Sequence, residues 1–177
     1  LYHTDHITTV SPNYAEEIQT ESLGFGLQGL LAGRRQHITG ILNGISTSEW
    51  DPATDPHLAK NYTNKKLSDK AVNKSTLQQQ MGLAVDSDIP LFGIVSRLNH
   101  QKGTDLLIQV APQITKIPAQ LVILGSDHAE LEHQLTALTQ TYPHEIAVHI
   151  GFSEALSHLI EAGADCFLMP SRFEPCG

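Results

Sequence analysis

Short, almost entirely apolar runs alternate with amphipathic stretches in the second half of the chain. The apolar runs predict strands, and the amphipathic stretches, with apolar residues at helical spacing, predict helices. Strands that are apolar on both faces and separated by helices are typical of a parallel sheet buried between two helical layers. We therefore predict an α/β fold, a Rossmann-like parallel sheet with helices on both faces. The predicted order is strand 91–95, helix 105–114, strand 120–124, helix 129–140, strand 146–150, helix 154–162 and strand 166–169.

The beginning of the chain follows a less regular pattern. A β-branched run at 5–10 predicts a short strand. Ser11 followed by Pro12 is typical of the N-cap and first turn of a helix, which we expect to continue over the polar residues 13–22. A second apolar run at 38–42 predicts another short strand.

An irregular segment rich in Pro and Asp separates these elements from the regular part. We place a domain boundary between Ile45 and Asn64, because Pro-rich, polar segments are typical of linkers. Residues 64–81 predict a polar helix that ends at Gly82. The predicted organisation is the end of one domain at 1–45, a linker at 46–63 and a second domain at 64–177.

The loop after strand 91–95 carries the first candidate chemistry. Arg97 and Lys102 are the cations of this loop, and Gly103 permits a close backbone approach or a positive φ just before the next helix. The first turn of a helix presents unpaired N–H groups and partial positive charge, so two cations at its rim would complete an anion site. We interpret the loop as a seat for a diphosphate. The alternative is that both are ordinary solvated surface cations.

Other candidate residues follow the remaining predicted strands. In a parallel α/β sheet the ligand binds at the carboxyl ends of the strands, where this sequence places Ser96, a glycine turn at Gly125, and Phe152 in position to stack on a flat base. Glu174 follows in a Pro-rich loop. Each has a simpler explanation alone, a core aromatic for Phe152 and a solvated acid for Glu174, but their convergence on one edge indicates a ligand site. Asn43 follows the apolar run 38–42. It either favours a left-handed turn or faces a ligand from the end of that predicted strand.

Composition narrows the class of partner. The chain has 177 residues, 40% hydrophobic and 17% charged, as expected for a soluble globular protein, and no apolar run reaches the length of a membrane span. Its net charge of −8 disfavours nucleic acid and anionic membranes as partners. Cys166 and Cys176 are too few for a disulfide framework and fit a reducing, cytoplasmic compartment. The chain begins without Met and ends without a helix stop, so we expect it to be part of a longer protein.

Two alternatives based on motifs are disfavoured. Residues 24–29 match G-x-G-x-x-G, but they do not follow a predicted strand as a dinucleotide-binding fingerprint must, so we interpret them as a turn. The ten histidines include no pair at H-x-x-x-H spacing around an acid and none paired with a cysteine at zinc-finger spacing. His128 and His133 lie five apart and do not share a helix face well. We predict no metal site and no cofactor.

Several segments together resemble the bacterial glycogen synthases and plant starch synthases that use ADP-glucose. Two motifs together are specific to that family. The first is Ser-Arg-Leu followed by Gln-Lys-Gly, at 96–103, and the second is Ser-Arg-Phe-Glu-Pro-Cys-Gly, at 171–177. The resemblance implies a GT-B glycosyltransferase of two facing Rossmann-like domains, of which this chain holds the end of the N-terminal and most of the C-terminal domain. The matching segments are 6–18, 42–45 with Trp50 and Pro52, 91–98 with 101–103, 150–152 and 170–177.

The resemblance also implies an activity, namely transfer of glucose from ADP-glucose to the non-reducing end of an α-1,4-glucan with retention. The residues matching Arg97 and Lys102 neutralise the departing diphosphate, which needs no metal. The residue matching Glu174 lies beside the donor glucose. The family pattern further implies that Phe152 stacks on adenine, that Asn43 contacts a sugar, and that loop amides around Cys176 and Gly177 hold sugar hydroxyls.

Departures from the family pattern limit this inference. Ser46 replaces the usual acid, and Asp127 stands where a second glycine often follows Gly125. The glycine-rich loop and histidine of the first domain are missing from this stretch, so we expect the isolated piece to be inactive. The alternatives are a non-catalytic nucleotide-binding module of the same fold, and a glycosyltransferase that uses UDP-glucose or makes a disaccharide.

Overall fold

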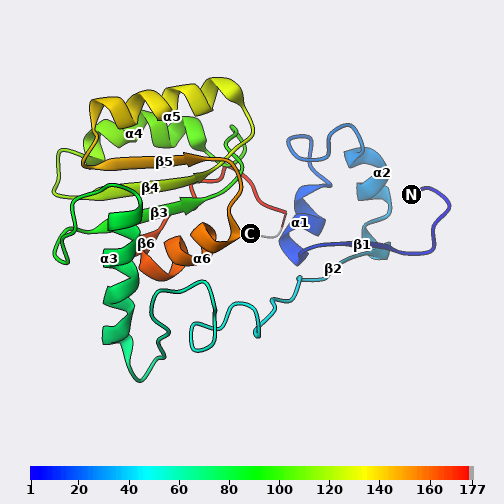
Figure 1. Ribbon diagram of the computed structural model, residues 1–177. Helices are drawn as coiled ribbons and strands as arrows, with labels where there is room; N and C mark the ends of the chain where they lie inside the picture. Colours follow the sequence, from blue (N-terminus) through cyan, green and yellow to red (C-terminus); the bar gives the residue numbers. More distant parts are fainter. Residues whose placement is uncertain (176–177) are drawn as a thin grey trace. The chain divides into compact units, whose positions relative to one another are not determined.

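The computed structural model describes residues 1–175 of the chain. The chain forms two compact units (Figure 1). One contains Leu1–Ser46 together with the residues from Phe173 on, and the other contains Thr47–Arg172. None of the described helices is both long enough and apolar enough to cross a membrane.

The first unit is built on two short parallel strands. β1 (Ile7–Thr9) pairs with β2 (Ile38–Gly40), with Ile7 opposite Ile38. Between them lie α1 (Pro12–Glu17), α2 (Gln28–Gly33) and the 3-10 turn η1 (Arg35–His37). Residues 24–27, part of the G-x-G-x-x-G match, form turns and bends that follow no strand, in agreement with the rejection of a dinucleotide fingerprint.

The start of α1 agrees with its sequence, but its end does not. The Ser11 hydroxyl accepts the Tyr14 N–H at 2.9 Å, and Pro12 occupies the first helical position. The helix ends at Glu17, five residues before the expected end at Ser22. The Thr20 hydroxyl donates to the Glu17 carbonyl at 2.7 Å, and such side-chain bonds to the backbone compete with helix continuation.

The second unit contains a four-stranded parallel sheet in the order β5-β4-β3-β6 (Figure 1). The predicted fold class is confirmed, and the predicted bounds of β3 and β5 agree exactly. The strand β6 pairs only over two residues, against Phe92 and Gly93 of β3. The strands are β3 (Leu91–Val95), β4 (Gln120–Gly125), β5 (Ile146–Ile150) and β6 (Cys166–Phe167).

Helices cover both faces of this sheet. In Figure 1, α4 (Thr104–Ile114) and α5 (Ala129–Thr141) lie on one face, and α3 (Lys70–Gln80) and α6 (Glu154–Gly163) lie on the other. Each helix contributes an apolar stripe to a buried core, as expected for amphipathic helices on a sheet. The helix predicted over 64–81 begins only at α3, after the 3-10 turn η2 (Leu67–Asp69). Gly82 follows α3 with φ of +74°, as predicted for its C-terminal glycine.

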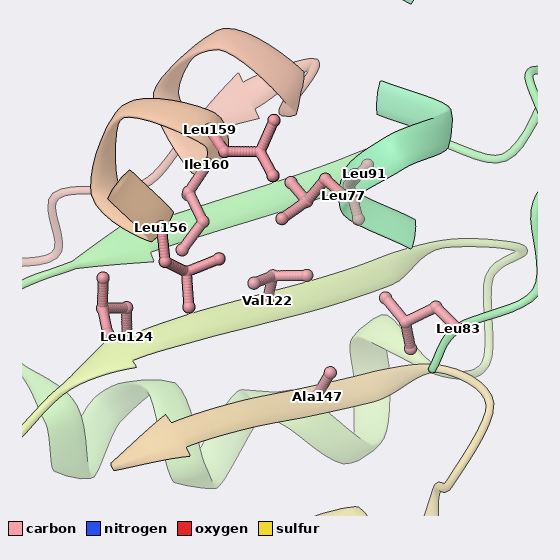
Figure 2. Packing of buried hydrophobic residues seen from close by; sticks show 9 residues of the cluster. All are labelled: Leu77, Leu83, Leu91, Val122, Leu124, Ala147, Leu156, Leu159 and Ile160. Carbon is pink, nitrogen blue, oxygen red and sulfur yellow. The ribbon is translucent and has the colours of Figure 1, made fainter. Parts of the chain in front are cut away.

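Alternation along the strands divides the core into two clusters. In β4, Val122 and Leu124 face α3 and α6, whereas Leu121 and Ile123 face α4 and α5, as the two-residue period of a strand requires. Figure 2 shows the first cluster, in which side chains of α6 and α3 meet those of the strands. It contains Leu77, Leu83, Leu91, Val122, Leu124, Ala147, Leu156, Leu159 and Ile160. The second contains Ile94, Leu98, Leu107, Ala111, Leu121, Ile123, Leu135 and Ile146.

Residues 47–63, which the sequence predicts as a linker, pack onto the second unit. The Trp50 ring stacks on His158 of α6, with centroids 3.9 Å apart and planes at 7°. Asp55 is buried and lies 2.7 Å from the Nδ1 atom of His158. The Asn73 side chain of α3 both donates to and accepts from the Lys60 backbone. Residues 47–63 form no helix or strand, and these contacts hold them against α3 and α6.

Candidate functional site

A pocket of about 370 Å³ lies at the carboxyl ends of β3, β4 and β5. Its size falls within the range that holds small-molecule ligands. Four residues that the sequence singled out, Ser96, Arg97, Gly125 and Phe152, line this one pocket. The full lining is Trp50, Val95, Ser96, Arg97, Leu124, Gly125, Ser126, Gly151, Phe152, Ser153, Ser157 and Glu161.

Close backbone packing forms the floor of the pocket. The Ser96 N–H donates to the Leu124 carbonyl at 3.1 Å, and the Leu98 N–H donates to the Ser126 carbonyl at 3.1 Å. A Cβ atom at Gly125 would lie 1.9 Å from the Ser96 carbonyl oxygen, far inside van der Waals contact. Glycine is therefore required here because the ends of β3 and β4 touch through their backbones. Gly125 is the last residue of β4 and lines the pocket, and its contact with a ligand stays a prediction.

The loop between β3 and α4 carries both candidate cations. Arg97 is exposed at the pocket and donates to the side-chain oxygen of Gln101 at 3.3 Å. Buried Asn99 organises the loop, because its side-chain oxygen accepts the Lys102 N–H at 3.0 Å and its amide donates to Asp127 at 2.7 Å. Asn99 thus ties the segment that bears Arg97 and Lys102 to the loop after β4.

Part of the α4 N-terminus is engaged by its own loop, and the seat for a diphosphate stays a prediction. The N–H groups of Gly103 and Thr104 donate to loop carbonyls, those of His100 and Asn99, each at 3.2 Å. Asp105 in the first turn is held by the Arg172 guanidinium through two hydrogen bonds of 2.7 and 2.8 Å. These hydrogen bonds keep the pKa of Asp105 well below its usual range.

Two aromatic residues and a glycine also line the pocket. Phe152 is 89% exposed, so its face is available to a ring of a ligand. Gly151, with φ of +131°, turns the chain from β5 into Phe152. The Ser153 hydroxyl caps α6 by accepting the Leu156 N–H at 3.3 Å. The second aromatic residue, Trp50, lines the pocket from the segment before α3.

Glu161 is the ionisable acid that lines the pocket. Partial burial raises the pKa of its carboxyl above the ordinary value of a glutamate. Neither Glu161 nor Ser157 was expected in the site. Both lie inside a predicted helix, and the sequence alone does not show which face of that helix turns toward the pocket. Trp50 was noted only as part of a family pattern, and its distance along the chain from β3 hid its place in the pocket.

The other predicted site residues are not among the residues that line this pocket. Asn43 and Glu174 belong to the first unit, where Asn43 is exposed and Glu174 is half-buried. Cys176 and Gly177 lie outside the described residues. Lys102 lies in the β3–α4 loop but is not part of the pocket lining. Asp127 departs from the family pattern, which made a contact between its backbone N–H and a ligand doubtful. That N–H donates to the Glu132 side chain at 2.9 Å.

Comparison with known proteins identifies the family. The model of the family described as glycosyl transferases group 1 matches residues 77–177, more than half of the chain. The chain belongs to this family of glycosyltransferases. The family description "starch synthase catalytic domain" matches residues 1–33, which lie in the first unit.

Curated relatives of this glycosyltransferase chain carry the name glycogen synthase. The relative from Nitrosomonas eutropha is 66% identical over 177 residues, which are 100% of this chain and 35% of that protein. The relative from Nitrosospira multiformis is 62% identical over the same length, 36% of that protein. The resemblance inferred from the sequence is thereby confirmed. The chain spans little more than a third of the length of these relatives.

A solved glycosyltransferase structure shares the fold. The catalytic domain of starch synthase IV from Arabidopsis thaliana, bound to ADP and acarbose, aligns with a TM-score of 0.91 and 38% identity. The alignment covers 98% of this chain and 36% of that one. The fold is therefore that of a GT-B glycosyltransferase in part, as predicted, with the Rossmann-like sheet incomplete in this stretch.

Proposed function

We propose that the protein carrying this chain transfers glucose from ADP-glucose to the non-reducing end of an α-1,4-glucan, with retention at the anomeric carbon. The observation that carries this proposal is the pocket at the ends of β3, β4 and β5, where an exposed guanidinium, an exposed aromatic face and serine hydroxyls meet. Support for the donor and acceptor comes from relatives named glycogen synthase and from a similar starch synthase solved with ADP and acarbose.

The proposed chemistry needs positive charge where the diphosphate departs. As the glycosidic bond to glucose breaks, negative charge grows on the β-phosphate oxygens, and a fixed cation there stabilises the transition state more than the ground state. Arg97 at the pocket and Lys102 in the same loop supply this charge in the proposal. Because loop carbonyls and Asp105 already engage the α4 N-terminus, the two side chains would provide most of the stabilisation.

The remaining roles follow from the pocket walls and from the family pattern. We assign the adenine to the exposed face of Phe152. From the family pattern we assign Glu174 to the neighbourhood of the donor glucose, Asn43 to a sugar contact, and the amides around Cys176 and Gly177 to sugar hydroxyls. These assignments involve residues of the first unit and residues outside the described range. They therefore rest on the resemblance, whereas the assignments of Arg97 and Phe152 also rest on the pocket.

Incorporation of labelled glucose from ADP-glucose into glycogen tests the proposal in the full-length protein. Replacing Arg97→Ala or Lys102→Ala should each lower kcat by roughly 10²- to 10³-fold, the usual loss when one group that stabilises developing charge is removed. Lys116→Ala is the matched control, since Lys116 is an exposed cation beyond the opposite end of α4, and its activity should equal that of the unaltered protein.

The same assay distinguishes the alternatives. Faster transfer from UDP-glucose than from ADP-glucose would assign a different donor. ADP binding without any glucose transfer would favour a non-catalytic nucleotide-binding module. We further propose that residues 1–177 alone lack transferase activity, and incorporation of glucose by the purified 177-residue chain would contradict that part.

A further inference from the structure

A second cluster of chemically active side chains lies outside the pocket lining. One ring nitrogen each of His57 and His158 and one carboxylate oxygen of Glu154 lie within 4.8 Å of one another. Glu154 and His158 are four residues apart on α6 and so share one face of that helix. His57 comes from the irregular segment before α3, nearly one hundred positions earlier, so spacing along the sequence could not show the cluster.

Buried Asp55 contacts the ring of His158 and the backbone of His57. Its Oδ2 atom lies 2.7 Å from His158 Nδ1, and the two side chains are only 6% and 2% exposed. Its Oδ1 atom accepts the backbone N–H of His57 at 2.8 Å. A carboxylate on one ring nitrogen fixes the proton there and leaves the other nitrogen, Nε2 of His158, as a lone-pair donor. This arrangement of carboxylate, histidine and metal is the one that supports metal-binding histidines in proteins.

The ring of His158 is also fixed by stacking. Trp50 lies parallel to it at 3.9 Å, and the His57 ring is tilted against it with centroids 4.8 Å apart. His158 thus cannot turn freely, whereas Glu154 and His57 are open to solvent. One rigid, buried ligand and two adjustable ones form a site that can contract around an ion with little loss of packing.

We propose that His57, His158 and Glu154 bind a divalent transition-metal ion of the Zn²⁺ class, with Asp55 as the supporting carboxylate. Two imidazoles and one carboxylate suit Zn²⁺, which takes four ligands in tetrahedral geometry and would keep a water in the fourth position. Ligand atoms bound at about 2.0–2.2 Å from one Zn²⁺ lie roughly 3.4 Å apart. The exposed side chains of His57 and Glu154 must therefore move inward by about an ångström on binding, which rotation about their side-chain bonds allows.

The ion would hold residues of the pocket in position and would take no part in the proposed glucosyl transfer. It would fasten the segment around His57 to the N-terminal turn of α6, and that segment also carries Trp50. Trp50 both stacks on His158 and lines the candidate nucleotide-sugar pocket. Metal binding is thus expected to hold the pocket wall formed by Trp50 in place. The site is independent of the proposed glucosyl transfer, since its binding can be measured without any sugar nucleotide.

Metal titration of the full-length, tag-free protein tests this inference. The protein is stripped with EDTA and titrated with Zn²⁺ against a chromophoric chelator, and Co²⁺ replaces Zn²⁺ to report a four-coordinate site by its visible absorption. The variants are His57→Ala and Glu154→Gln, both at solvent-accessible positions that leave the buried Asp55–His158 pair intact. The controls are His144→Ala, an exposed histidine, and Glu130→Gln, a first-turn glutamate of α5.

The expected result is one ion per chain in the unaltered protein and in both controls, with a Kd at least tenfold higher in His57→Ala and Glu154→Gln. Thermal midpoints of the stripped variants should equal that of the stripped unaltered protein, which shows that the loss is one of binding and not of folding. Absence of Zn²⁺ binding in the unaltered protein overturns the inference. Equal affinity in His57→Ala, Glu154→Gln and the controls overturns it too, because binding would then belong to scattered surface histidines.

Discussion

Gly103, between the candidate cation loop and α4, allows a sharp test of the loop packing. Its φ is +72°, and a Cβ atom added there would lie 2.2 Å from the Pro170 carbonyl oxygen. Gly82 has almost the same φ, +74°, but a Cβ atom there would meet nothing within 4 Å. Gly103→Ala and Gly82→Ala therefore share the cost of left-handed backbone and differ in one contact.

The structure sets the size of each effect. An L-residue in the left-handed region costs about 1–2 kcal/mol, offset by about 0.4–1 kcal/mol from the lower entropy of the unfolded chain. We therefore expect Gly82→Ala to lower the free energy of unfolding by about 1 kcal/mol. Gly103→Ala must also separate the two loops by about 1.2 Å to reach ordinary contact at 3.4 Å, and such overpacking adds about 1–3 kcal/mol. The expected total at Gly103 is about 3 kcal/mol.

Urea unfolding followed by tryptophan fluorescence measures both variants on the same scale. The chain has one tryptophan, Trp50, which is stacked on His158 inside the unit that contains both glycines. Its emission therefore reports the unfolding of that unit alone, even if the two units unfold separately. Equal losses in the two variants, within about 0.5 kcal/mol, would refute the reasoning, because Gly103 would then not be packed against Pro170.

Two further predictions concern ion pairing and buried amides. Since the pKa of the Asp105 carboxyl is held low, the stabilisation from its pair with Arg172 is present above the ordinary Asp pKa of about 3.9 and is lost as pH falls through the folded value. Arg172→Gln should raise the pKa of Asp105 in a carboxyl-carbon NMR titration, and an unchanged titration would contradict this pairing. Gln120→Leu removes the 2.8 Å hydrogen bond that the buried Gln78 amide donates to Gln120 and the one that Gln120 donates to the Ala84 carbonyl. We expect a loss of about 2 kcal/mol in urea unfolding, against less than about 0.5 kcal/mol for Gln134→Leu on the exposed face of α5.

The sheet was predictable because each strand is apolar on both faces. The run 91–95 is buried or half-buried throughout, and the run 146–150 begins buried and ends exposed. In both, the strand begins and ends with the apolar run. The helices after them begin within one residue of the prediction. Elements with one weak apolar face were less predictable. The polar stretch 64–81 becomes helical only from Lys70, where its side chains begin to contact α6.

The pocket was predictable only in part, because pattern reasoning sees one strand end at a time. Ser96, Arg97, Gly125 and Phe152 follow predicted strands, and a parallel sheet must bring those ends to one edge. Trp50, by contrast, reaches the pocket through tertiary packing of an irregular segment, and no local periodicity indicates that. Whether Arg97 and Lys102 act on a diphosphate stays a prediction.

The loops of the second unit are held to one another at two junctions. The β3 and β4 ends are joined through backbone contacts at Gly125, and the β3–α4 loop meets the loop after β6 at Gly103 and Pro170. Arg172 reinforces that second junction by donating to the His100 carbonyl and to Asp105. The α4 dipole is thereby balanced inside the protein by a carboxylate that is itself paired. If the proposed function holds, the side chains of Arg97 and Lys102 would meet the diphosphate on a loop that these two junctions hold in place.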